Sequence, residues 1–358
     1  MELGRVKRIA IKIGSNVLTD SQGFLNTGRM DELVRQISGI RSSGIEVVVI
    51  SSGAVASGKG LFQPRQKLDT VGQRQMWSSL GQVKLIQSYS SLFEKYQILC
   101  SQILVTRDDF RSREHYLNMK NCLTILLTNG IIPIINENDV VSVTELMFTD
   151  NDELAALVAS MLNVDSLIIL TSVDGIFQSS ETGDQQLIKT VSPGEKEYEK
   201  YVFTGKSAFG KGGMLTKAHM ASKAADAGIE VMIANGLRDN ILIDLMEKRA
   251  PHTLFLPSLG KSNIKKWLSH AKGFEKGWVV INDGALTALR SRKASSLLPV
   301  GVVQVEGNFK KGDIITIFNM QKNQVGLGMS QYDDAQTREK LGKKNQRPLI
   351  HYDYLFLL

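Results

Sequence analysis

The sequence has only two cysteines and no recognisable pattern of metal ligands. Two cysteines in 358 residues exclude a disulfide framework, and we expect Cys100 and Cys122 to be reduced, buried thiols in a cytoplasmic protein. The five histidines are scattered along the chain without the spacing of a zinc site. The sequence therefore predicts neither a disulfide-rich fold nor a protein-bound metal.

Long apolar runs are also missing. No stretch approaches the ~20 apolar residues of a membrane-spanning helix, and residues 1–12 lack the apolar core of a signal peptide. We therefore expect no membrane contact. Hydrophobic residues still make up 42% of the chain, which is enough for a packed core, and 358 residues suit two domains or one large and one small domain.

The two commonest nucleotide-binding motifs are absent. Residues 205–207 (G-K-S) resemble the end of a P-loop, but the first glycine of that motif would fall on Lys200. Gly210 and Gly212 begin a G-x-G-x-x-G pattern, but Leu215 stands where its last glycine belongs. By motif, the chain is neither a P-loop NTPase nor a dinucleotide-binding dehydrogenase.

The net charge of +7 is unevenly distributed along the chain. Residues 1–260 carry 27 Lys+Arg against 28 Asp+Glu, whereas residues 261–358 carry 16 against 8. The basic character therefore belongs to the C-terminal part. Such charge is typical of a nucleic-acid-binding surface, and it is also typical of an ordinary solvated face.

Apolar runs alternate with amphipathic stretches over residues 1–257. This alternation predicts an α/β domain, with a mostly parallel sheet between helices on both of its faces. Residues 178–209 are polar and irregular, which indicates an excursion or lid. The expected strands are residues 8–13, 46–50, 98–105, 131–135, 166–170 and 229–234, and the expected helices are residues 30–41, 70–96, 115–129, 153–161, 214–225 and 239–248.

The pattern changes after residue 257. Residues 258–276 are expected to form a charged linker with a short helix at 263–269. From residue 277 onward, short β-like segments alternate with turns, one of them at residues 282–284. We therefore expect a small, basic, β-rich domain over residues 277–358.

Polar residues follow three expected strands, where open α/β sheets bind their ligands. Lys12 lies near the end of the first strand, Ser52 follows the second, and Asp139 closes the polar run 136–139. Each also has an ordinary structural explanation, namely a solvated strand end, a serine N-cap and an Asx turn. Both interpretations stay open at each position.

Residues 149–152 (T-D-N-D) precede an expected helix. Asp150 is a good N-cap, and acidic residues suit the positive end of a helix. The alternative is functional: one acid of this run orients a cluster of lysines while Asn151 faces the substrate.

Residues 210–217 (G-K-G-G-M-L-T-K) form a glycine-rich turn that leads into an expected helix. Backbone N–H groups and the helix dipole can hold phosphate there, although such a turn can also merely cap a helix. Lys12 and Lys217, from opposite ends of the domain, would suit phosphoryl transfer, which needs cations and positioned reactants. A carboxylate acceptor is already an anion at neutral pH and would need no general base.

Seven segments in chain order resemble the amino acid kinase superfamily, and more closely the glutamate 5-kinases that carry a C-terminal PUA domain. The resemblance implies an amino acid kinase fold plus a PUA-like domain. It implies transfer of phosphate from ATP, with Mg²⁺, to L-glutamate, giving L-glutamyl 5-phosphate in the first step of proline synthesis. The segments are I-K-I-G-S-N (11–16), S-S-G-A-V-A-S-G (51–58), I-I-N-E-N-D (134–139), D-N-D-E-L-A-A-L (150–157), L-T-S-V-D-G (170–175), G-G-M-L-T-K-A (212–218) and S-S-L-L-P-V-G (295–301).

The resemblance also implies roles for individual residues. Lys12 and Lys217 would stabilise the transferring phosphoryl group, and Asp152 would hold both lysines. Proline as a feedback inhibitor and homo-oligomers formed through the kinase domain are implied too. The residues implied to bind glutamate are Ser52, Asp139 and Asn151, with Asn136 and Asp150 close by. The residues implied to line the ATP site are Lys12, Thr171, Ser172, Lys211, Gly212, Gly213, Met214, Leu215, Thr216 and Lys217.

Two positions depart from the family pattern, and two other functions remain open. Ser172 stands where the family usually has aspartate, and Lys211 stands where a small or hydroxyl residue is usual. One alternative is another amino acid kinase, acting on N-acetylglutamate or aspartate, for example. The other is an RNA-binding protein that uses its basic C-terminal domain, although Trp278 and Phe309 offer no clear stacking platform there.

Overall fold

The computed structural model describes residues 6–64, 68–111, 113–141, 151–179, 185–199, 213–258, 275–291 and 295–357. The chain divides into two compact units, an N-terminal unit of residues 1–259 and a C-terminal unit of residues 260–358. In the described part, no helix combines the length and the apolar character needed to cross a membrane.

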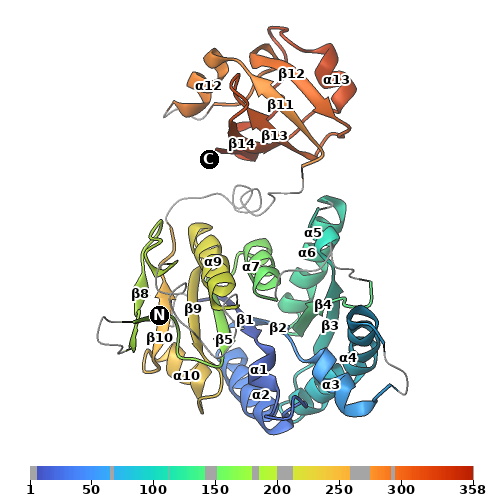
Figure 1. Ribbon diagram of the computed structural model, residues 1–358, viewed down its shortest axis with the longest axis vertical. Coiled ribbons are helices and arrows are strands. Elements are labelled where there is room, and N and C mark those ends of the chain that lie inside the picture. The colour runs from blue at the N-terminus through green and yellow to red at the C-terminus, as the bar shows by residue number, and fades with distance from the viewer. Residues whose placement is uncertain are drawn as a thin grey trace. The chain divides into compact units, whose positions relative to one another are not determined.

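The N-terminal unit is built on an eight-stranded sheet of order β3-β4-β2-β1-β5-β9-β10-β8 (Figure 1). Neighbouring strands run parallel from β3 to β9, and only β10 runs antiparallel to its neighbour β9. The predicted mostly parallel sheet is confirmed. Its strands are β1 (Arg8–Ile13), β2 (Glu46–Ser51), β3 (Cys100–Val105), β4 (Ile132–Glu137), β5 (Ser166–Thr171), β8 (Thr190–Val191), β9 (Glu230–Asn235) and β10 (His252–Phe255).

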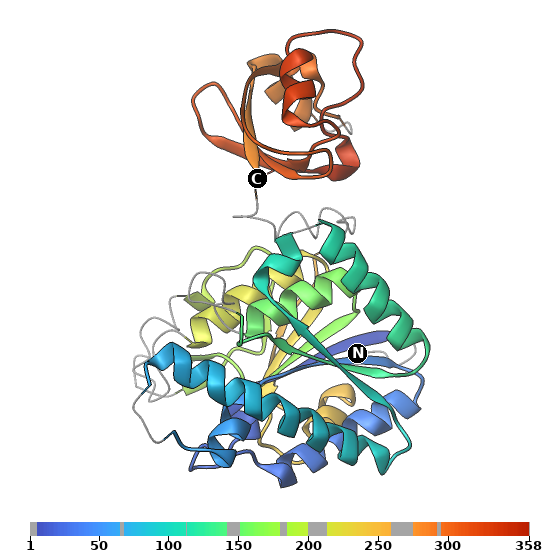
Figure 2. The same cartoon turned by 90° about the vertical axis from the view of Figure 1, so that its right-hand side faces the viewer.

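Helices cover both faces of this sheet (Figures 1 and 2). One layer contains α1 (Ser15–Leu18), α2 (Thr27–Ser42), α3 (Ala54–Leu61), α4 (Thr70–Glu94) and α10 (Ile241–Met246). The other layer contains α5 (Arg107–Arg111), α6 (Arg113–Thr128), α7 (Asn151–Leu162) and α9 (Gly213–Asp226).

Strand β1 lies in the middle of the sheet and points its side chains alternately to the two layers. Ile9, Ile11 and Ile13 are fully buried in the core shared with α2 and α4. Lys12 points to the opposite face, toward α7, and its side chain is only 2% exposed. A lysine at such a position needs a partner for its charge, because burying an unpaired ammonium group is costly.

Glycines let α3 and α4 touch through their backbones. A Cβ atom at Gly81 of α4 would lie 1.8 Å from the carbonyl oxygen of Ala54, and one at Gly58 of α3 would lie 1.8 Å from that of Trp77. The hydroxyl groups of Ser51 and Tyr89 are hydrogen-bonded at 2.8 Å, which ties α4 to the end of β2. These contacts fix the position of α4 relative to α3 and to the end of β2.

The C-terminal unit has its own five-stranded sheet, of order β12-β11-β13-β14-β15, and its own hydrophobic core. The predicted β-rich character is confirmed, but the turn expected at residues 282–284 is wrong. Asn282 instead caps helix α12 by accepting a hydrogen bond from the N–H of Ala285, because an asparagine suits an N-cap as well as a turn. The elements are β11 (Gly277–Ile281), α12 (Asp283–Arg290), β12 (Val302–Gly307), β13 (Ile314–Phe318), β14 (Gln324–Met329), α13 (Asp334–Glu339) and β15 (Leu355–Leu357).

Several other expectations need correction. Helix α3 and strand β10 were not predicted. The stretch 178–209, expected to be irregular, overlaps the end of β6 (Phe177–Ser179) and contains β7 (Gln185–Leu187) and β8. Cys122 is exposed and Cys100 only half-buried, although both thiols were expected to be buried. Cys122 precedes the buried Leu123, so it lies about 100° around α6 from the side that packs inward. The helix expected at residues 263–269 lies outside the described residues.

Candidate active site

Three charged side chains from distant parts of the chain meet at the carboxyl end of β1. Lys12 Nζ lies 2.6 Å from Asp152 Oδ1, and Lys217 Nζ, on α9, lies 2.7 Å from Asp152 Oδ2. The side chain of Asp152 is fully buried, and that of Lys217 is 15% exposed. One carboxylate therefore holds two ammonium groups, and these three groups together carry a charge of +1.

The local backbone favours an anion next to these lysines. Asp152 lies in the first turn of α7, where the helix dipole stabilises its negative charge. Helix α9 begins at Gly213, and no atom lies within 4 Å of where a Cβ would stand there. At Gly14, which follows β1, a Cβ would lie 3.7 Å from Lys12 Nζ and 3.1 Å from the carbonyl oxygen of Leu170. A glycine therefore leaves the space beside Lys12 clear.

Asn151 connects the lysine cluster to the ends of two further strands. Its amide nitrogen donates hydrogen bonds to Ser52 Oγ at 3.0 Å and to Asn136 Oδ1 at 3.1 Å. Asn136 and Glu137 belong to β4 and are buried, so the chain does not turn at these positions. The structure thus brings together three of the residues expected at the glutamate site.

Asp139 lies beside this group but has partners that the sequence did not indicate. Its Oδ1 accepts hydrogen bonds from Arg74 Nε at 2.9 Å and Arg74 Nη2 at 2.7 Å, and its Oδ2 accepts one from Ser78 at 2.9 Å. Arg74 Nη2 also lies 3.5 Å from Glu137 Oε2. No local pattern reveals these pairs, because Arg74 and its acidic partners are more than 60 residues apart.

The expected nucleotide residues lie at the end of β5 and at the start of α9. Thr171 ends β5 and is nearly buried, and Ser172 follows it, half-buried. The carbonyl oxygen of Thr171 accepts a hydrogen bond from the N–H of Gly236 at 2.7 Å. Gly213, Met214, Leu215 and Thr216 form the first turn of α9. Lys211 and Gly212, like Asp150 of the glutamate group, lie outside the described residues.

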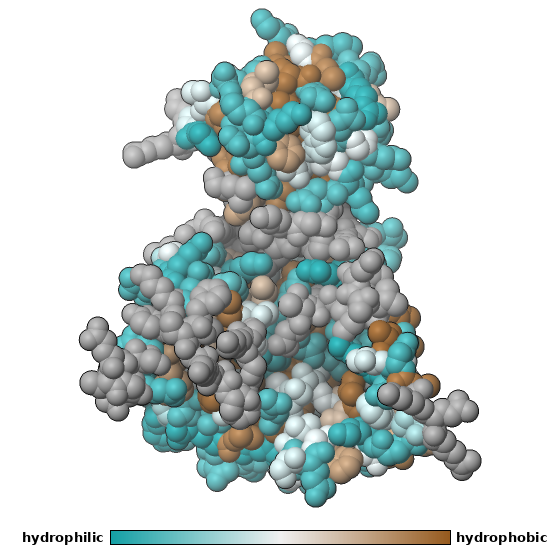
Figure 3. Space-filling model, in the orientation of Figure 1, coloured by the Kyte–Doolittle hydropathy of each residue, from teal (hydrophilic) through white to brown (hydrophobic). Residues whose placement is uncertain are grey.

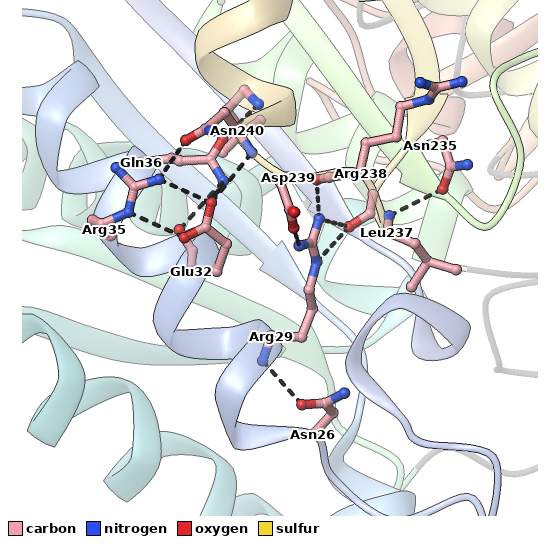
Figure 4. Close-up of polar contacts among 12 residues, drawn as sticks. Asn26, Arg29, Glu32, Arg35, Gln36, Asn235, Leu237, Arg238, Asp239 and Asn240 are labelled. Carbon is pink, nitrogen blue, oxygen red and sulfur yellow. Dashed lines mark hydrogen bonds and ion pairs between the residues drawn. The ribbon is translucent and has the colours of Figure 1, made fainter.

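A polar cavity of about 490 Å³ lies between the start of α2 and the turn after β9 (Figure 4). Arg29 crosses it, with a side chain only 9% exposed, and donates hydrogen bonds to the carbonyl oxygens of Gly236 and Arg238. Arg238 in turn pairs with Asp174, and this hydrogen bond lowers the pKa of the carboxyl group. The turn after β9, whose Gly236 N–H binds Thr171, is therefore held by Arg29 and by the ion pair of Arg238 with Asp174.

Replacing Arg29 by methionine is expected to lower the free energy of unfolding by about 2 kcal/mol, because two carbonyl oxygens lose their charged donor. Urea unfolding of the purified variant measures this loss. Arg35→Met, on the same helix, is the matched control, since the half-exposed Arg35 pairs only with the side chains of Glu32 and Asn240, and such exposed contacts contribute less than about 1 kcal/mol each. Equal losses in the two variants would contradict a clamping role for Arg29.

Comparison with known proteins agrees with this arrangement. Residues 7–235 match the sequence model of the amino acid kinase family, and residues 277–351 match that of the PUA domain. Carbamate kinase from Giardia lamblia bound to AMP-PNP shares the fold of the N-terminal part. Its TM-score is 0.51 at 19% identity, over 71% of this chain and 99% of that one.

Relatives along the full length are more similar. A protein named Glutamate 5-kinase from Bacteroides thetaiotaomicron is 50% identical over 354 residues, which is 98% of both chains. Another of the same name from Chlorobaculum tepidum is 44% identical over 353 residues, again 98% of both. The resemblance seen in seven sequence segments is thereby confirmed. The chain belongs to the amino acid kinase family and, within it, to the glutamate 5-kinases with a C-terminal PUA domain.

Proposed function

We propose that this enzyme transfers the γ-phosphoryl group of ATP to the side-chain carboxylate of L-glutamate, giving L-glutamyl 5-phosphate. The observation that carries the proposal is the buried carboxylate of Asp152, which holds Lys12 and Lys217 at the carboxyl edge of the sheet. Membership among proteins named Glutamate 5-kinase supports the choice of acceptor.

The chemical step needs no general base. An oxygen of the glutamate carboxylate, already an anion at neutral pH, attacks the γ-phosphorus of ATP. The bond from that phosphorus to the β,γ-bridging oxygen breaks, and ADP leaves with the electron pair. Lys12 and Lys217 neutralise the charge on the transferring group, and Asp152 holds them in place before the reaction begins.

Magnesium is proposed to arrive with ATP. In the part of the chain that the structure describes, no three His, Cys, Asp or Glu side chains lie together as a metal site. Mg²⁺ usually takes most of its ligands from substrate phosphates and water. Bound to ATP, the ion would add positive charge beside the phosphates.

The nucleotide and glutamate are proposed to bind at neighbouring parts of the carboxyl edge. Thr171, Ser172 and the segment 211–217 would line the ATP site, with phosphate near the start of α9. The neutral Ser172 leaves that site without the carboxylate usual in the family. The glutamate site would use Ser52, Asn136, Asp139, Asn151 and Asp150.

Asp139→Ala is expected to raise the KM for glutamate roughly 10- to 100-fold, because the substrate ammonium loses a charge-assisted hydrogen bond. The KM for ATP should change less than about threefold, since Asp139 lies at the other end of the site. Steady-state kinetics with each substrate varied in turn measures both constants. Asp31→Ala, which removes an exposed carboxylate from α2, is the control. A fall in kcat with an unchanged glutamate KM would exclude this role.

Trapping with hydroxylamine tests the proposed reaction directly, because acyl phosphates react with it to form hydroxamates. ATP, Mg²⁺ and hydroxylamine are combined with glutamate, N-acetylglutamate or aspartate in parallel. Hydroxamate from glutamate alone supports the proposal. Hydroxamate only from N-acetylglutamate or aspartate would show that the enzyme uses a different acceptor. No hydroxamate from any of the three acids would refute acyl phosphate formation.

Family membership suggests the biological setting. We propose that the reaction is the first step of proline synthesis, that it takes place in the cytoplasm, and that proline inhibits it. We also propose a homo-oligomer formed through the kinase domain. In support of an oligomer, apolar side chains are exposed at the edge strand β3 and on helix α4: Leu99, just before β3, is 72% exposed, and Val83 of α4 is 67% exposed.

The C-terminal unit is proposed to be a solvated regulatory domain. On the face seen in Figure 3, hydrophilic residues surround scattered hydrophobic ones in this unit. Phe309 is only 1% exposed and offers no open face for a base, and Trp278, which is half-buried, packs edge-on against Phe318. RNA binding remains the second candidate because of the basic charge. Filter binding at increasing salt would reveal it as a steep loss of affinity.

A further inference from the structure

Arg74 covers two buried carboxylates at the end of β4. Its side chain is 42% exposed, whereas Asp139 is 7% and Glu137 4% exposed. Ser78, one turn further along α4, holds the second oxygen of Asp139. The guanidinium group therefore lies between the acidic end of the strand and the solvent.

The guanidinium uses only part of its hydrogen-bonding capacity. Nε and Nη2 donate to Asp139, and Nη2 also approaches Glu137, while Nη1 donates to no group in the described chain. A guanidinium group is planar and offers two edges, each able to bind a carboxylate through a pair of N–H groups. On the edge formed by Nη1 and Nη2, the N–H groups of Nη1 are available for a second carboxylate, while Nη2 also approaches Glu137.

This edge lies at the far end of the proposed substrate site. A continuous series of contacts leads from Asp152 through the adjacent Asn151 to Asn136 of β4, whose strand continues toward Asp139. Strand β2 separates β1, which carries Lys12, from β4. Two strand spacings amount to about 10 Å. The reacting carboxylate of a substrate held near Lys12 can therefore have its other end near Arg74.

We propose that Arg74 and Asp139 together recognise the α-amino acid end of the substrate. Asp139 accepts hydrogen bonds from the α-ammonium group, and Arg74 binds the α-carboxylate through the edge that includes Nη1. An α-amino acid carries these two charges on one carbon, which matches a paired carboxylate and guanidinium. The inference rests on the proposed function, and it makes Arg74 a residue that determines substrate specificity.

The test combines substrate analogues with variants of Arg74, and reads kcat/KM from hydroxamate formation. 4-Aminobutanoate lacks the α-carboxylate of glutamate, and glutarate lacks its α-amino group. The variants are Arg74→Gln and Arg74→Lys, the second of which keeps the charge and guards against misfolding. Lys84→Gln is the control, because it removes an exposed positive charge from the same helix.

In the wild-type enzyme, loss of the α-carboxylate should lower kcat/KM roughly 10- to 100-fold, the size of a charge-assisted hydrogen bond. In Arg74→Gln this penalty should shrink to less than about threefold, because kcat/KM for glutamate falls while kcat/KM for 4-aminobutanoate hardly changes. The penalty in Arg74→Lys should lie between those of the wild type and Arg74→Gln, and the penalty in Lys84→Gln should match that of the wild type. The KM for ATP should stay constant throughout.

Other outcomes separate the possible errors. If Arg74 only orients Asp139, Arg74→Gln will lower kcat/KM equally for glutamate and 4-aminobutanoate and leave kcat/KM for glutarate unchanged. The proposal is then wrong. Equal losses for all three substrates, together with a lower unfolding temperature, would show a structural role and also overturn it. No hydroxamate from glutamate in the wild type would instead refute the proposed function, and the inference with it.

Discussion

Replacing Lys12 by methionine is expected to lower kcat by roughly 10³-fold, with less than about a threefold change in the KM for glutamate. The ammonium group stabilises charge that is greatest on the transferring phosphoryl group, so its loss raises the barrier more than it weakens ground-state binding. Lys217→Met should behave in the same way, since both lysines contact Asp152. Hydroxamate formation at saturating glutamate and ATP measures the fall.

Lys12 is also buried, so stability must be measured beside activity. The single variant leaves Asp152 with one lysine fewer, and breaking a buried pair typically costs about 3–5 kcal/mol of unfolding free energy. Because Lys217 shares the same carboxylate, the triple variant Lys12→Met/Asp152→Asn/Lys217→Met removes all three charges and should recover much of that loss in urea. Its kcat should stay as low as that of the single variant. Recovery of kcat together with stability would mean that Lys12 serves only the fold.

Gly81→Ala is expected to destabilise the protein by more than about 3 kcal/mol. The new Cβ would lie 1.8 Å from the carbonyl oxygen of Ala54 and 2.5 Å from the nitrogen of Gly58. These are backbone atoms of α3, so the clash can be relieved only by moving the two helices apart, which exceeds ordinary overpacking of side chains. The midpoint of urea unfolding measures the effect.

Gly39→Ala provides the matched control. Gly39 lies inside helix α2, and no atom stands within 4 Å of its added Cβ. Alanine is the better helix former by about 0.8–1.0 kcal/mol, so this variant should be slightly more stable than the wild type. Because α4 carries Arg74 and Ser78, the folded fraction of Gly81→Ala should also bind glutamate more weakly. Unchanged stability in Gly81→Ala would show that the two helices separate easily.

The sequence predicts the framework of the site well. Apolar runs identify β1, β2, β4 and β5, and parallel strands bring the residues that follow them to one edge of the sheet. Ser52 and Asn136 are brought together at that edge for this reason. The functional roles of these residues remain predictions until the kinetic tests are made.

Pairs made across the fold are harder to predict from sequence. Arg74 lies on an amphipathic helix, where periodicity indicates which face is buried but not which acid lies opposite. Arg29 likewise binds carbonyl oxygens more than 200 residues away. Helix α12 was missed because Asn282 and the residues after it suit either a turn or an N-cap, and only the packing of Leu289 into the core decides between them.

The central place of β1 also affects how the chain folds during its synthesis on a ribosome. Strand β2 follows within about 30 residues, but β5, which covers the other edge of β1, begins only at Ser166. At about 5–20 residues per second, that edge has no partner from β5 for about 8–30 s after β1 has been made. Lys217, the last residue to join Asp152, is made later still. The nascent chain therefore passes through a period in which an apolar strand edge is open to chaperones and to other nascent chains.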